Sequence, residues 1–161
     1  MIYNDKDKTL QWLDENEIHY DLYLHDPIYT VEESKNIHIH IPWSHTKNLF
    51  LRDKKWAYYL VTMIADKKLD GKNFKSLTGI KDFSFANADQ LYEKISIRPG
   101  LVSIFWLINN PSIILYIDED IWDSDYVWRH PNDNTATIVI NHDMFIKYLK
   151  ISWITYDIIR L

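Results

Sequence analysis

Hydrophobic and polar positions follow two different periods along the chain, and together they predict short strands interspersed with short helices. Leu10 and Leu13 lie three positions apart among charged residues, which predicts an amphipathic helix over residues 5–16. Residues 18, 20, 22 and 24 are apolar or aromatic and alternate with polar neighbours. That alternation is typical of a half-buried strand.

The middle of the chain predicts a hairpin followed by helices. Two β-rich runs, 48–53 and 56–64, are separated by the charged pair at 54–55, as in a β-hairpin. Short helices are predicted near 72–77 and 88–95. Before the hairpin, Thr30 followed by Glu33 matches a capping box at the start of a short helix.

The last third of the chain predicts a second hairpin and a strand–helix–strand ending. A turn at 98–100 leads into the apolar run 101–108, and Asn109-Asn110-Pro111 turns the chain into residues 113–117. A strand at 135–140, a helix at 142–149 and a strand at 153–159 complete the prediction. We therefore expect one α+β domain over residues 1–161, with a mixed, largely antiparallel sheet or barrel and surrounding short helices.

Composition removes several classes of chemistry. The 161 residues include no cysteine, which excludes thiolate catalysis, iron–sulfur clusters and cysteine-based zinc sites. Three glycines are too few for a glycine-rich phosphate-binding loop. The charged amino terminus resembles no signal peptide, and the apolar runs are far shorter than a membrane span, so a cytoplasmic protein is predicted.

The net charge of −5 argues against a nucleic-acid partner until its distribution is considered. Residues 1–34 carry two basic and nine acidic side chains, and residues 99–161 carry four and eight. Residues 35–98 carry twelve basic and six acidic side chains. A basic middle section between acidic flanks is suited to a small anionic target.

Two clusters of potential metal ligands each have a simpler interpretation. The acidic run at 118–125 fits either a divalent-cation site or a solvated turn that caps a short helix, and it lacks the glycine and distal glutamate of an EF-hand. His38 and His40 would share one strand face, with His45 as a third ligand, or they are partly exposed histidines. No metal site is predicted.

Two further segments carry candidate chemistry. Lys47 and Asn48 lie at the entry to a predicted strand, where an ammonium can stabilise developing negative charge and an amide can donate and accept hydrogen bonds. Pro131 restricts His130 to extended geometry in a turn that could present the imidazole to a pocket. The alternatives are a solvated strand start and an ordinary loop histidine.

The order of these segments resembles the YbaK/ProX family of trans-editing deacylases, related to the editing insertion of bacterial prolyl-tRNA synthetase. The most specific motifs are H-T-K-N-L-F-L-R-D-K-K at 45–55 and H-P-N-D-N-T-A-T at 130–137. Further matches are H-D-P-I-Y-T-V-E-E at 25–33, Y-Y-L-V at 58–61, A-D-K-K-L-D at 65–70, S-F-A at 84–86, R-P-G-L-V-S at 98–103 and D-E-D at 118–120. The resemblance runs from about residue 5 to the end.

The resemblance implies hydrolysis of the ester that joins a wrong amino acid, alanine, to tRNA(Pro), without metal or organic cofactor. By motif match the catalytic residues are Lys47, Asn48 and His130. The substrate-binding residues implied in the same way are Thr46, Phe50, Gly100, Val102, Ser103 and Asn134. The implied partners are the acceptor end of tRNA(Pro) and a prolyl-tRNA synthetase, with no DNA and no membrane.

The chain departs from the family pattern at four positions. Ile104 replaces a loop proline, Trp106 and Trp43 replace glycines, and Arg129 replaces a residue that is commonly aromatic. If the loop lines the amino-acid pocket, the bulky side chains of Ile104 and Trp106 would narrow, reshape or close it. The alternatives are therefore removal of cysteine or another small amino acid, or a non-catalytic module that binds the tRNA acceptor end or a synthetase.

Overall fold

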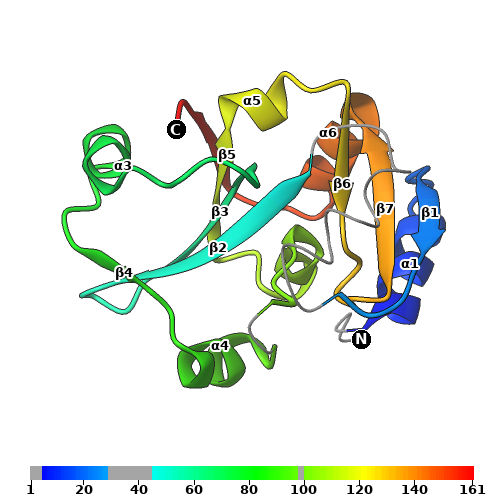
Figure 1. Cartoon of the computed structure of the whole chain (residues 1–161), viewed down its shortest axis with the longest axis horizontal. Helices are drawn as coiled ribbons and strands as arrows, with labels where there is room; N and C mark the ends of the chain where they lie inside the picture. The colour runs from blue at the N-terminus through cyan, green and yellow to red at the C-terminus, as the bar shows by residue number, and fades with distance from the viewer. Residues whose placement is uncertain (1–4, 29–44, 98–99) are drawn as a thin grey trace.

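Two β-sheets lie side by side with helices around them (Figure 1). The computed structural model describes residues 5–28, 45–97 and 100–161. One sheet has three antiparallel strands in the order β1-β7-β6, and the other has five strands in the order β4-β2-β3-β5-β8. The strands of the two sheets are β1 Asp21–Leu24, β2 Thr46–Asp53, β3 Tyr58–Ile64, β4 Phe83–Phe85, β5 Ile114–Asp118, β6 Tyr126–Arg129, β7 Ala136–Asn141 and β8 Tyr156–Ile159.

Four of the helices begin at a residue whose side chain caps the first turn. Asp5, Asp70, Asn87 and Asn141 accept hydrogen bonds from first-turn backbone amides of α1, α3, α4 and α6, as N-cap residues do. The helices are α1 Lys6–Glu15, α3 Gly71–Thr78, α4 Ala88–Ile95, α5 Glu119–Trp122, α6 His142–Ile151 and the 3-10 helix η1 Ile104–Asn109.

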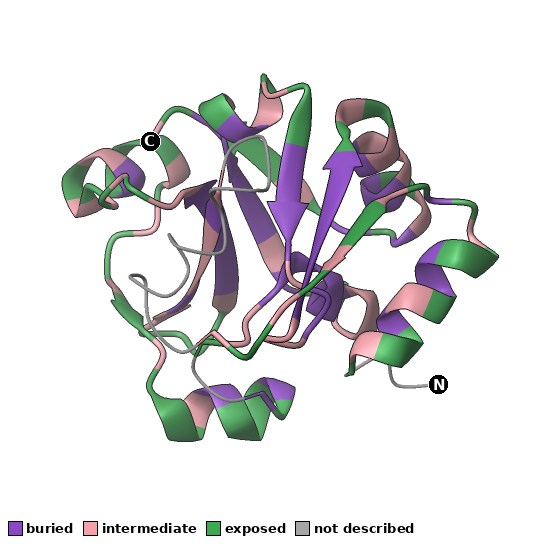
Figure 2. Cartoon of the chain, turned by 45° about the vertical axis from the view of Figure 1, so that its right-hand side comes forward, coloured by how far each residue is buried: buried purple, intermediate pink, exposed green. Residues whose placement is uncertain are grey.

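The main core lies between the two sheets, and a second apolar cluster lies on the outer face of the five-stranded sheet (Figure 2). Phe50 of β2 points into the main core, whereas Leu51 packs with Phe74 of α3 in the second cluster. Burial of both faces explains why β3 and β5 are almost continuously apolar. The five-stranded sheet is therefore packed against apolar side chains on both faces.

Several predicted elements are confirmed. The helix predicted over 5–16 is α1, the hairpin predicted over 48–64 is β2–β3, and the helix predicted near 88–95 is α4. The predicted final helix and strands correspond to β7, α6 and β8. The α+β class is confirmed, with two open sheets and no closed barrel among the described residues.

The predicted second hairpin is wrong. Residues 104–109 form η1, and β5 pairs parallel with β3, as β8 does with β5. Ser103 begins η1 by accepting a hydrogen bond from the backbone N–H of Phe105 at 3.3 Å. Four consecutive side chains from Ile104 are buried, so this run has no exposed face and its sequence carries no period that separates helix from strand.

The strand predicted from alternation at 18–24 is only partly correct. Ile18 is buried, but Leu22 and Leu24 of the edge strand β1 are 42% and 70% exposed, and Tyr23 packs against Trp128 and Val139 rather than in the main core. The short strands β4 and β6 were not predicted. The helix predicted from Thr30 and Glu33 lies outside the described residues. None of the described helices is long and apolar enough to cross a membrane.

Candidate active site

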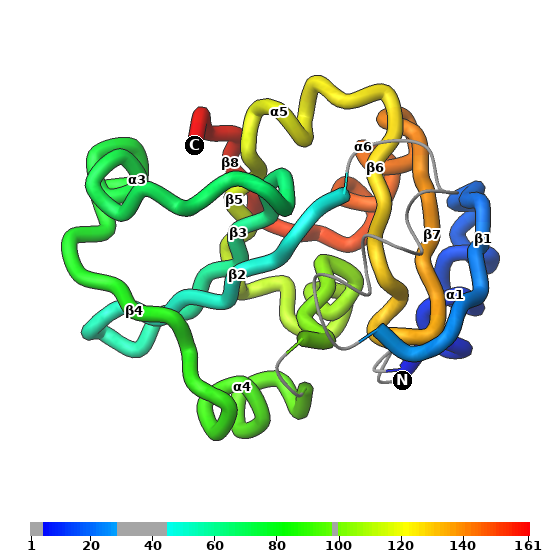
Figure 3. The backbone as a smooth tube through the Cα atoms, in the orientation of Figure 1, coloured from blue at the N-terminus to red at the C-terminus, as the bar shows by residue number. Residues whose placement is uncertain are grey.

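The candidate site forms where the start of β2 meets the end of β6, so it joins the two sheets (Figure 3). The hydroxyl of Thr46 donates to the carbonyl oxygen of Trp128 at 2.8 Å, and Arg129 Nη1 donates to Thr46 Oγ1. The ring of His45 stacks on Trp128, with centroids 4.7 Å apart and planes inclined by 21°. Strands far apart in the sequence are thus fixed against each other.

Asn48 and His130 meet at the backbone of Val102. Asn48 Nδ2 donates to the Val102 carbonyl oxygen at 3.0 Å, and His130 also hydrogen-bonds the Val102 backbone. Asn48 Oδ1 and His130 Nδ1 are buried and have no hydrogen-bond partner among the described residues. The structure therefore brings together three predicted site residues and leaves an acceptor and a ring nitrogen available to a ligand.

The surroundings of His130 favour the neutral imidazole. Burial lowers the pKa of His130 to about 4, and the neighbouring charges of Arg129 and His45 lower it further. Asp133 and the hydrogen bond to Val102 oppose this shift. Near neutral pH His130 is thus an uncharged ring that can accept or donate a hydrogen bond.

Arg129 is an unusual buried charge beside this group. Its side chain is 2% exposed, and its guanidinium carbon lies 5.3 Å from the ring centroid of Phe145 in α6. Nε and Nη2 have no hydrogen-bond partner among the described residues. Burial lowers the pKa of Arg129 to about 9, with the nearby Tyr148 hydroxyl opposing the shift.

Lys47 lies on the opposite face of β2 from Asn48, because successive strand residues point to opposite faces. Its Nζ donates to the carbonyl oxygen of Ala65 at 2.8 Å and to that of Lys67. Burial lowers the pKa of Lys47, and the charge of Lys68 lowers it further, whereas Asp66 raises it. The described structure does not bring Lys47 together with Asn48 and His130, and its catalytic role stays a prediction.

The remaining predicted substrate-binding residues divide into two groups. Gly100 has a φ of 88°, in the left-handed region that favours glycine, and precedes the loop that carries Val102 and the buried Ser103. Phe50 and Asn134 are used inside the fold. Phe50 is 6% exposed in the main core, and Asn134 Nδ2 donates to the Ile28 carbonyl oxygen at 3.1 Å.

The loop that carries His130 is held by α1 and by its own turn. Asn132 has a φ of 59°, and its Nδ2 donates to Thr9 Oγ1 at 3.0 Å. Asp133 Oδ1 accepts from the Thr135 backbone N–H at 2.7 Å. The sequence predicted a turn here, and these contacts fix the position of His130 relative to β6.

The acidic run at 118–125 is built into ion pairs. Asp118 is fully buried and accepts from Lys67 Nζ at 2.8 Å, and Asp120 pairs with the same ammonium at 2.6 Å. The predicted short helix is α5, but Asp118 at its N-cap position makes no side-chain capping hydrogen bond. No group of three metal-ligating side chains occurs among the described residues, and His38 and His40 lie outside them.

The departures from the family pattern occupy different environments. Ile104 and Trp106 are 0% and 5% exposed and belong to the main core, and the Ile104 carbonyl oxygen accepts from the Tyr148 hydroxyl at 2.6 Å. Both therefore lie behind the loop that begins at Gly100. Trp43 lies outside the described residues.

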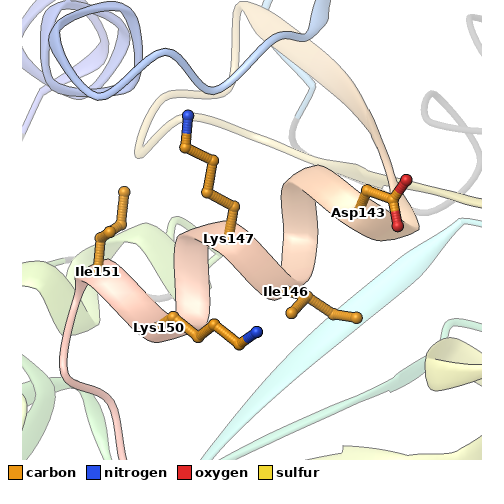
Figure 4. A pocket seen from close by; sticks show the side chains of 5 residues that line it. All are labelled: Asp143, Ile146, Lys147, Lys150 and Ile151. Carbon is orange, nitrogen blue, oxygen red and sulfur yellow. The ribbon is translucent and has the colours of Figure 1, made fainter.

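A shallow hollow on α6 is separate from this cluster (Figure 4). It is lined by Asp143, Ile146, Lys147, Lys150 and Ile151. Lys147 Nζ donates to the Glu17 carbonyl oxygen at 2.9 Å, so it serves to hold α6 to the end of α1. None of the predicted site residues lines this hollow.

Comparison with known proteins identifies the group to which this geometry belongs. The aminoacyl-tRNA editing domain family matches residues 25–148. The chain belongs to this family. Its resemblance to editing deacylases is thereby confirmed, and so is the class of an aminoacyl-tRNA editing hydrolase.

Individual relatives cover most of the chain. The prolyl-tRNA editing protein ProX of Acetoanaerobium sticklandii is 36% identical over 159 residues, 97% of each chain. The prolyl-tRNA synthetase associated domain-containing protein 1 of Bos taurus is 26% identical over 132 residues, 78% of this chain and 77% of its own. A crystal structure provisionally assigned as a trans-editing enzyme for prolyl-tRNA synthetase shares the fold, with a TM-score of 0.71, 17% identity and 97% of each chain covered.

Sequence reasoning noted Arg129 only as a departure, and did not predict its contact with Thr46 or its charge beside His130. The available signal was the spacing: Arg129 lies two positions after the apolar Val127 in a stretch with high β-propensity. Because residues two apart share a strand face, Arg129 had to point into the core with Val127.

Proposed function

We propose that this protein hydrolyses the ester between a misplaced amino acid, alanine first, and the 3′ end of tRNA(Pro). One structural observation carries the proposal: Asn48 and His130 converge on the Val102 backbone, and each keeps a buried polar atom that has no hydrogen-bond partner in the described part of the chain. It is supported by membership of the aminoacyl-tRNA editing family and by 36% identity to a protein named for prolyl-tRNA editing.

The proposed reaction is attack of water on the ester carbonyl carbon. The bond from that carbon to the ribose oxygen breaks, the ribose oxygen takes one proton of the water, and the amino acid leaves as its carboxylate after the second proton is released to solvent. Because an aminoacyl ester is already activated, orienting the water and stabilising the oxyanion are sufficient. Asn48 and neutral His130 would orient the aminoacyl group and the water, with assistance from the ribose 2′-hydroxyl.

Lys47 is proposed to hold the terminal nucleotide. Its ammonium is bound to the carbonyl oxygens of Ala65 and Lys67, so this role requires the lysine side chain to exchange one of these contacts for the substrate. The ammonium would then bind the terminal nucleotide from the face of β2 opposite to Asn48, while Asn48 and His130 act on the ester itself.

Specificity for alanine is proposed to depend on the loop that carries Val102 and Ser103. Ile104 and Trp106 form the buried wall behind it and limit how far it can retreat. Because one methylene changes binding by only about 1–3 kcal/mol, cysteine or another small amino acid is the nearest alternative substrate.

The decisive experiment compares deacylation of purified Ala-, Cys- and Pro-tRNA(Pro) by the wild type and by Lys47→Ala. We expect Ala-tRNA(Pro) to be hydrolysed fastest and Pro-tRNA(Pro) to be spared. Rates equal to the uncatalysed rates on all three would reject hydrolysis and favour a binding module. An unchanged rate in Lys47→Ala would reject only the role of that lysine. Adding prolyl-tRNA synthetase to the assay tests the proposed second partner.

A further inference from the structure

Three side chains share one face of β2 between the candidate site and the β2–β3 turn, and the middle one, Phe50, is buried in the main core. Asn48, Phe50 and Arg52 occupy alternate positions and therefore share one face of the strand. From Asn48 to Arg52 the strand rises about 13 Å. Figure 1 shows β2 running from its start beside β6 to the turn near β4 and α4.

Aromatic rings and cations pair along this row. The ring of Tyr58, which lies opposite Arg52 in the hairpin, stacks on buried Phe50 with centroids 5.3 Å apart. Lys94 Nζ of α4 lies 5.4 Å from the centroid of the Tyr58 ring. The Arg52 guanidinium carbon lies 4.1 Å from the centroid of Trp56, which is 63% exposed. Each cation thus covers a flat ring.

The turn at the end of the row has a fixed shape. Asp53 Oδ1 accepts from the backbone N–H groups of Lys55 and Ala57 at 2.8 and 2.9 Å. Trp56 has a φ of 64°, a conformation that a bulky residue rarely adopts, and these contacts fix the backbone of the turn on both sides of it. The turn also exposes the ammonium groups of Lys54 and Lys55, and that of Lys54 lies 3.1 Å from Asp82.

We propose that the cations and aromatic rings at the turn end of this row bind the acceptor end of the tRNA substrate. We call this surface the β2 strip (Arg52, Lys54, Lys55, Trp56, Tyr58 and Lys94). The inference rests on the proposed function and extends it from the ester to the rest of the RNA. Bases stack on exposed aromatic rings and phosphates bind nearby cations in single-strand recognition. With the ester beside Asn48, the preceding nucleotides lie along the strip toward Trp56.

The strip also explains how an acidic protein can bind RNA. Three basic residues lie close together at its turn end, at 52, 54 and 55, with one acidic residue, Asp53, among them, whereas most acidic side chains lie in the flanking sections of the sequence. The negative flanks would repel an RNA that approached elsewhere. Binding is thereby restricted to the face that ends at the candidate site.

A pair of exposed tryptophans provides the test. Trp153 is 86% exposed and has a φ of 55°, so Trp153→Ala matches Trp56→Ala in exposure and backbone conformation but lies after α6, outside the strip. Both variants are assayed on Ala-tRNA(Pro) and on alanyl-adenosine. We expect Trp56→Ala to raise KM for the tRNA about tenfold, leave alanyl-adenosine hydrolysis unchanged, and Trp153→Ala to change neither.

The cations of the strip predict a salt dependence. Replacing Lys54 and Lys55 by alanine should make the dependence of log affinity on log salt concentration less steep by about 1.4, because each phosphate contact contributes about 0.7. The measurement uses tRNA that carries no amino acid. The matched control replaces Lys72 and Lys75, exposed on α3, and should leave the slope unchanged.

Two results would overturn the strip. One is an equal effect of the two tryptophan substitutions on KM for tRNA, and the other is an equal loss by Trp56→Ala on both substrates. Failure of the wild type to hydrolyse either substrate would instead reject the proposed function. In that case the strip still stands or falls on whether Trp56→Ala weakens binding of uncharged tRNA and Trp153→Ala does not.

Discussion

Two buried charges in this fold are compensated in different ways. Asp118, with no exposed surface, accepts from Lys67 Nζ at 2.8 Å and from the Leu161 backbone N–H at 3.3 Å. Arg129, 2% exposed, has no carboxylate partner among the described residues, and its Nη1 donates to the neutral hydroxyl of Thr46. One charge is neutralised locally and the other is not.

The difference separates a fold-supporting group from a site. Burying an uncompensated charge is costly, so a structural role alone favours the arrangement around Asp118. Around Arg129 the neighbouring Asn48 and His130 also keep buried polar atoms without partners among the described residues. Unsatisfied groups and shifted pKa values that occur together are typical of functional sites.

The largest expected effect is on stability at the compensated end. Lys67→Met leaves Asp118 buried without its ion pair, and we expect unfolding free energy to fall by about 3 kcal/mol. Lys54→Met, which breaks the exposed pair with Asp82, should cost less than about 1 kcal/mol. Urea denaturation measures both, and equal midpoints would contradict the contrast.

The next effect is on activity at the uncompensated end. Asn48→Ala and His130→Ala should each slow single-turnover deacylation about 100-fold or more, because each removes a group aimed at the reacting ester. Asn73→Ala is the matched control, since Asn73 Nδ2 also donates to a backbone carbonyl oxygen, that of Arg160 at 2.9 Å. If all three variants lost activity equally, Asn48 would have only a structural role.

A smaller effect is predicted for Arg129 itself. Arg129→Met keeps most of the side-chain volume and removes a buried charge, so we expect stability at pH 7 to be equal or higher by about 1–2 kcal/mol. Thermal unfolding checks this. A large destabilisation would show that Arg129 is compensated after all, and would remove the contrast with Asp118.

The smallest effect is on pH dependence. Because the pKa of His130 is lowered to about 4 in the fold, the unfolded chain binds its proton first on acidification. The His130 contribution to stability is therefore complete above about pH 6.5 and is lost as pH falls toward 4. Arg129→Met should raise the pKa of His130 and reduce that loss, as imidazole NMR titration would show. An unchanged titration would mean that the charge of Arg129 does not act on His130.

Much of the fold was predictable because helices and strands with one polar face have a regular period of apolar residues in the sequence. The helix around Leu13 and the hairpin around Lys54 have one polar face or a polar turn, and both were found. The run from Ile104 was misassigned because it is buried on all sides, which removes the period. β3 and β5 pair in parallel although they are far apart in the sequence. A local pattern of apolar and polar residues does not indicate such long-range pairing.

For the site, residue types were more predictable than their directions. Asn48 and His130 were predicted as site residues by motif, and the structure places both beside the Val102 backbone, which no local pattern indicates. The neighbouring Lys47 was grouped with Asn48, yet adjacent strand residues face opposite sides. Strand alternation alone was enough to predict that separation.

The strand order of the three-stranded sheet has a consequence for the order in which the protein folds during synthesis. β1 pairs with β7, so Asp21 can pair only after Val139 has been synthesised, more than a hundred residues later in the chain. The β2–β3 hairpin and β4 are close in sequence and can form early, but His130 and Arg129 join them only when β6 and β7 assemble. Contacts of such long range form slowly. A nascent chain on the ribosome would therefore display the β2–β3 turn well before it acquires the completed site.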